Sequence, residues 1–176
     1  MGNMKIRHDK IIKMKTDNRF KYTGALVLGM HDALVEISGI IAGLTFAIAD
    51  RKIIIMTGAI AAVAASLSMA AANYQAQRAD ENPYALTAAL YTGAMYIGTS
   101  AALIFPFALI QNRFWALGMM GLIAVLIIFG FNCAVGHAMN RPFMKRFGEM
   151  LIICTGVSVA SFIIGMLAKY FMGVQI

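Results

Sequence analysis

Two acidic residues, Asp32 and Glu36, lie inside an otherwise apolar stretch from Thr23 to Ala49. An ionisable group within the hydrocarbon of a membrane is costly unless it is paired, hydrated or neutralised, so such residues usually belong to a pathway or a binding site. On a helix, residues four apart lie on one face, which puts both carboxylates together. We therefore expect this face to hold a proton, bound water or a cation.

The next apolar stretch, GAIAAVAASLSMAAANYQAQ, supplies two further candidates, Met69 and Asn73, which again share one helical face. Its many small residues allow a neighbouring helix to come close. A thioether and an amide oxygen beside carboxylates suit a borderline transition metal such as Fe²⁺ better than Mg²⁺ or Ca²⁺. Ordinary packing is the alternative for Met69, and an interhelical hydrogen bond is the alternative for Asn73.

The composition indicates a membrane protein that must position these groups within helices. Of 176 residues, 60% are hydrophobic and only 13% are charged, with a mean hydropathy of +0.74. A soluble domain of this size could not bury so much apolar surface, whereas runs of about 20 apolar residues cross a bilayer. The sequence predicts an all-α integral membrane protein with five transmembrane helices, at about 23–49, 53–78, 83–110, 114–140 and 147–172.

The distribution of basic residues predicts the orientation. The net charge is +7, but its placement argues against nucleic acid as a partner. With a cytoplasmic N-terminus, eleven Lys and Arg residues fall inside and four fall outside, which fits the positive-inside rule and gives N-in, C-out. The basic segment 1–22 would then lie at the anionic inner leaflet of the membrane.

No enzyme signature is present: the sequence lacks GxSxG, HExxH, a Walker loop and a dinucleotide fingerprint. We therefore expect no enzymatic activity, no ATP hydrolysis and no cofactor. Cys133 and Cys154 lie within predicted spans without CxxC spacing and are expected to pack as apolar residues. His31 should miss the acidic face, because adjacent residues on a helix point about 100° apart.

The motifs of these spans resemble those of the vacuolar iron transporter family. The first span, VLGMHDALVEISGIIAGL, and the second, AAVAASLSMAAANYQAQ, are similar to the first two spans of that family. The segment LTAALYTGAMYIGTSAALIFPFAL resembles its third span, and FGFNCAVGHAMNRPFMKRFGEMLIICTGVSVASFIIGML resembles its fourth and fifth. The resemblance runs in order over residues 24 to 172.

The resemblance implies a five-helix homodimer with a metal path along the subunit interface. Members of the family move Fe²⁺, and often Mn²⁺, out of the cytosol in exchange for protons. Asp32 corresponds to the family's first-span aspartate and Met69 to its second-span methionine, and both are implied metal-path residues. The implied partners are a second copy of the chain, membrane lipid, the divalent metal ion and protons.

This chain departs from the family pattern at several positions. The family's second-span glutamate, eight residues before the methionine, is here Ala61, and the glycine after the first-span aspartate is Ala33. Asn73 stands where Gly or Glu is common, and Glu36 is an additional acid that we expect to replace the missing carboxylate. The cytoplasmic helices between the second and third spans are absent, since the connection is only QRADENPY.

The sequence therefore predicts a dimeric Fe²⁺ or Mn²⁺ transporter that exports metal from the cytoplasm by proton antiport, with the metal as substrate. Asp32 would bind metal and exchange protons, and Met69, Glu36 and Asn73 would complete the polar lining. The predicted location is the plasma membrane of a prokaryotic cell. The alternative is a non-transporting membrane assembly module, in which the acids of the first span pair with a partner chain.

Overall fold

A computed structural model describes residues 22–139 and 143–172. Apart from Tyr22, the predicted basic N-terminal segment lies outside the described residues. Five helices in the described part are long and apolar enough to span a membrane, which confirms the predicted all-α fold with five spans. They are α2 (Thr23–Ala47), α3 (Arg51–Ala79), α4 (Ala85–Leu109), α5 (Arg113–Met139) and α6 (Phe143–Met172). The last begins before its predicted start at residue 147.

Two of the short polar connections begin the next helix with a side-chain cap. Asp50 accepts a hydrogen bond from the backbone N–H of Lys52 at the start of α3, at 2.8 Å. Asn112 accepts from the N–H of Phe114 at the start of α5, at 2.9 Å. Each cap satisfies an amide that has no partner within its own helix, so these polar residues fix where α3 and α5 begin.

Two arginines tie helix ends together at the same end of the bundle. Arg51, at the start of α3, donates through Nη1 to the carbonyl of Ile110 just after α4, at 3.1 Å. Arg113, at the start of α5, donates through Nη1 to the carbonyl of Ile48 just after α2, at 2.7 Å. Carbonyls at a helix C-terminus lack intrahelical partners, so these bonds both satisfy them and hold neighbouring ends in register.

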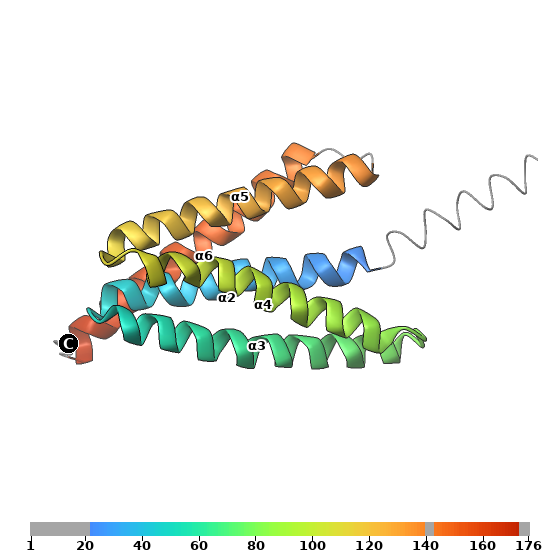
Figure 1. The fold of residues 1–176 in the computed structure, drawn as a ribbon, viewed down its shortest axis with the longest axis horizontal. Coiled ribbons are helices and arrows are strands. Elements are labelled where there is room, and N and C mark those ends of the chain that lie inside the picture. The colour runs from blue at the N-terminus through green and yellow to red at the C-terminus, as the bar shows by residue number, and fades with distance from the viewer. Residues whose placement is uncertain (1–21, 140–142, 173–176) are drawn as a thin grey trace, which may run out of the picture.

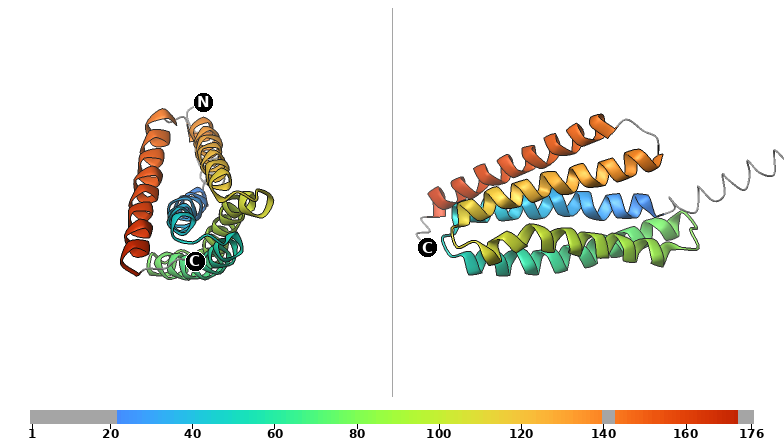
Figure 2. Two further views of the ribbon diagram at one scale, coloured as in Figure 1. Left: turned by 90° about the vertical axis from the view of Figure 1, so that its left-hand side faces the viewer. Right: turned by 45° about the horizontal axis from the view of Figure 1, so that its top comes forward.

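Helix α2 is the centre of the bundle and contacts all four other helices. Figure 1 shows it between α5 and the α3–α4 pair, and the end-on view in Figure 2 shows the other helices around it. The largest fully buried side chains gather around α2 and α4: Tyr96, Phe107, Met30, Leu34, Ile37, Ile41, Ile54 and Leu103. Many large apolar side chains of α3, α5 and α6 are exposed on the single chain, as expected for surfaces in contact with lipid or another subunit.

Glycines allow the closest helix contacts on α2. A Cβ atom at Gly29 would collide with the backbone carbonyl of Thr92, so α2 and α4 are in backbone contact there. A Cβ at Gly165 of α6 would lie 2.6 Å from the carbonyl oxygen of Gly43, and a Cβ at Gly39 would lie 2.9 Å from Ser161 Oγ. The GIIAG segment is thus the packing surface for α6, as small residues at this spacing often are.

Gly29→Ala should lower the thermal unfolding temperature of the protein in detergent. The added methyl meets backbone rather than a movable side chain, so α2 and α4 must separate, at a cost of about 1–3 kcal/mol. The matched control is Gly98→Ala on α4, where a Cβ meets nothing within 4 Å. An equal effect of both substitutions would contradict the close approach of α2 and α4.

Candidate functional site

The two acids of α2 share one helical face, and neither is paired with a Lys or Arg of the described residues. Asp32 is half-buried, whereas Glu36 is exposed on the single chain. Glu36 Oε2 accepts a hydrogen bond of 2.5 Å from the hydroxyl of Tyr96, a fully buried residue of α4. Among the described side chains no Lys or Arg forms an ion pair with either acid within 4.0 Å. Glu36 is therefore held by a tyrosine hydroxyl and not by a basic side chain.

One turn before Tyr96, Thr92 joins three helices through its hydroxyl. Thr92 Oγ1 donates toward the carbonyl of Ala25 on α2 at 3.1 Å, and it accepts from Asn73 Nδ2 of α3 at 2.5 Å. Asn73 is buried and also lies 3.4 Å from the carbonyl of Ala88. Asn73 therefore makes the interhelical hydrogen bond that was the alternative to a metal ligand, and its place in a metal path stays a prediction.

Met69 lies on α3, half-buried and packed against the hydrophobic core. No hydrogen bond or ion pair joins Met69, Asn73, Asp32 and Glu36 to one another in the described part of the chain. That part also contains no group of three or more His, Cys, Asp and Glu side chains that could hold a metal ion. On this face of a single chain, the two carboxylates of α2 are thus the groups best suited to bind a metal ion.

The sequence analysis missed Thr92 and Tyr96, although both are polar residues within an apolar span. They lie four apart on α4, so they share a face, and Ser100 continues it by donating to the carbonyl of Tyr96 at 2.8 Å. All three are fully buried. The spacing of four among polar residues of an apolar span was the available signal, because polar groups that become buried need a hydrogen-bond partner.

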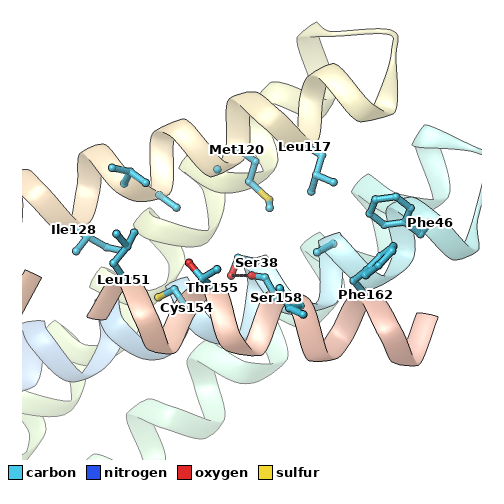
Figure 3. A pocket seen from close by; sticks show the side chains of 15 residues that line it. Ser38, Phe46, Leu117, Met120, Ile128, Leu151, Cys154, Thr155, Ser158 and Phe162 are labelled. Atoms are coloured by element: carbon cyan, nitrogen blue, oxygen red, sulfur yellow. Dashed lines mark hydrogen bonds between the residues drawn. The ribbon is translucent and has the colours of Figure 1, made fainter. Parts of the chain in front are cut away.

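A cavity lies elsewhere, between α2, α5 and α6. Its volume is about 440 Å³. Figure 3 shows its wall, with Met120 and Leu117 from α5 facing Cys154 and Thr155 from α6. Its lining is almost entirely apolar, and Ser38 Oγ lies 3.3 Å from Ser158 Oγ, so the serines bind each other. This lining presents no charged group to balance a cation, whereas the acidic face of α2 presents two carboxylates.

Tyr96→Phe should destabilise the protein in detergent by about 1 kcal/mol, because Glu36 loses the hydroxyl that it accepts from. The ring and its packing stay in place, so the change reports the hydrogen bond alone. Tyr91→Phe is the matched control, since Tyr91 is exposed on the same helix. The measurement is the thermal unfolding temperature, and a value equal to that of the control would show that the bond contributes nothing.

Comparison with known proteins agrees with the motifs of the first two helices. A model described as the VIT family matches residues 23–85, a range that covers α2, α3 and the first residue of α4. All four predicted site residues lie within the matched range. No curated protein matches the chain. The match to the VIT family confirms the resemblance in the motifs of the first two helices and supports the membership of this chain in the vacuolar iron transporter family.

Proposed function

We propose that this chain exports Fe²⁺ or Mn²⁺ from the cytoplasm in exchange for protons. Membership of the VIT family indicates membrane transport of iron or manganese. The observation that supports a path at α2 is its pair of acids, which has a tyrosine hydroxyl but no described cation as a partner. Two carboxylates can balance one divalent ion, and in its absence they can hold protons instead. That exchange is what metal–proton antiport requires.

Each residue of the acidic face has a distinct role in this proposal. Asp32 makes no hydrogen bond with the described residues, so it can bind the metal ion and release its proton without breaking a contact. Glu36 supplies the second carboxylate, and Tyr96 orients it through the 2.5 Å hydrogen bond. Met69 supplies a thioether, which favours a transition metal over Mg²⁺ or Ca²⁺.

A second copy of the chain completes the site in this proposal. One chain offers only two carboxylates on this face, and Glu36 is exposed on the single chain. The exposed surface of α3 is rich in small residues that permit close helix contact: Ala59, Ala64, Ser68, Ala71 and Ala72. A homodimer formed across such a surface would double the number of ligands along the interface. The excess of basic residues on one side predicts a cytoplasmic N-terminus. The short connection between the second and third spans favours a prokaryotic plasma membrane as the location.

Asp32→Ala should abolish uptake of radioactive Mn²⁺ into proteoliposomes that contain the purified protein. The substitution removes a carboxylate that the metal needs, whereas Asp80→Ala removes an exposed carboxylate beyond the end of α3 and should leave the rate unchanged. Uptake is measured as initial rate against empty liposomes. Wild-type uptake by Asp32→Ala would mean that the metal does not pass this residue.

Mn²⁺ or Fe²⁺ should raise the thermal unfolding temperature of the wild-type protein in detergent, and Mg²⁺ should not. A ligand at about 100 times its Kd stabilises the folded state by about 2.7 kcal/mol. The gain should disappear in Asp32→Ala. In the alternative, a membrane assembly module, stability would not respond to metal, and loss of Asp32 would change the oligomeric state instead.

A further inference from the structure

A second cavity, with polar residues in its wall, lies between α2, α5 and α6. Its volume is about 360 Å³, and its lining includes His31 of α2, Asn132 of α5, and Glu149 and Met150 of α6. His31 follows Met30 and precedes Asp32 in the sequence, but adjacent residues on a helix point about 100° apart. The cavity therefore uses a different face of α2 from the one that carries the two acids.

His31 has an unsatisfied ring nitrogen beside this cavity. Among the side chains that the structure describes, His31 Nε2 is the buried nitrogen or oxygen atom that has no hydrogen-bond partner. A buried polar atom left unpaired costs about 1–3 kcal/mol, and such atoms are nearly always satisfied in native proteins. Because His31 lines the cavity, its unpaired nitrogen points to a ligand that enters the cavity beside it.

The other groups in the wall favour a metal ion as that ligand. Glu149 is exposed, so its carboxylate is accessible to an ion. Asn132 Nδ2 donates to the carbonyl of Ile128 at 2.8 Å and to Met150 Sδ at 3.1 Å, and this bond holds the thioether at the cavity. A thioether sulfur has two lone pairs, so one remains for another partner. Imidazole, carboxylate and thioether together suit a borderline or soft transition metal, not Mg²⁺ or Ca²⁺.

We propose that this cavity binds one divalent transition-metal ion through His31 Nε2, the Glu149 carboxylate and Met150 Sδ. The three ligands come from α2 and α6, and Asn132 of α5 positions the sulfur. This site is separate from the acidic face of α2 and does not depend on transport through that face. Helix α2 then presents a metal-binding group on each of two faces.

The test measures binding of Co²⁺ to the full chain in detergent by equilibrium dialysis, with the visible absorption of Co²⁺ as the report on its ligands. Asp32→Asn serves as the background, because it removes a charge from the acidic face and changes none of the residues that line the cavity. In this background His31→Gln and Glu149→Gln should each weaken Co²⁺ binding about tenfold or more, as loss of metal-site residues does, and should change the absorption bands. Glu81→Gln, in the turn between α3 and α4, is the matched carboxylate control.

Met150→Leu gives an independent variant that keeps the apolar volume of the side chain. It should weaken Co²⁺ binding and alter its spectrum, while Met120→Leu, in the wall of the apolar cavity, should do neither. Circular dichroism and gel filtration check that each variant is folded. The proposal is overturned if Asp32→Asn binds no Co²⁺, or if the folded His31, Glu149 and Met150 variants bind it as tightly as their controls. The cavity would then hold water. Loss of Mn²⁺ uptake in Asp32→Ala is unaffected by either result, so the two proposals can fail separately.

Discussion

The hydrogen bond between Tyr96 and Glu36 is the interaction on which the candidate site depends, because it satisfies an acid within a membrane span without neutralising it. It forms only if α4 lies at one position against α2. Thr92, one turn before Tyr96 on α4, fixes that position because its hydroxyl bonds both α2 and Asn73 of α3. Gly29 allows the backbones of α2 and α4 to touch. The buried polar residues of α4 thus determine which face of α2 remains open.

Helix α2 serves different purposes on its different faces. Gly39 and Gly43 pack against α6, where an added Cβ would lie against the side chain or the carbonyl of Ser161. Its acids lie toward Tyr96 of α4, and His31 lies at the cavity shared with α5 and α6. A central helix that contacts every other helix can present chemically distinct groups in several directions. In the two proposals, these few ionisable residues of the membrane spans serve two separate sites.

The sequence predicted the helices well and their contacts poorly, for physical reasons. Long uncharged runs can form only spanning helices in a membrane, and Asp32 and Glu36 were visible because charge is rare there. The spacing of residues along one helix, however, identifies only the residues that lie on the same face of that helix. The partners of Glu36 and Asn73 come from α4, and the residues that line the cavity together with His31 come from α5 and α6, far away in the sequence. Such partners depend on how the helices pack against one another, and the periodicity of a single helix carries no information about that packing.

Proton movement driven by a Mn²⁺ gradient, followed with a pH-sensitive dye inside proteoliposomes, tests the central claim that the acidic face of α2 exchanges metal for protons. The account predicts that Mn²⁺ entering the vesicles drives protons outward, and that Asp32→Ala loses this proton movement together with the metal flux. Mn²⁺ transport with no opposing proton movement would contradict antiport. Undiminished proton movement in Asp32→Ala would show that the exchange takes place elsewhere in the protein.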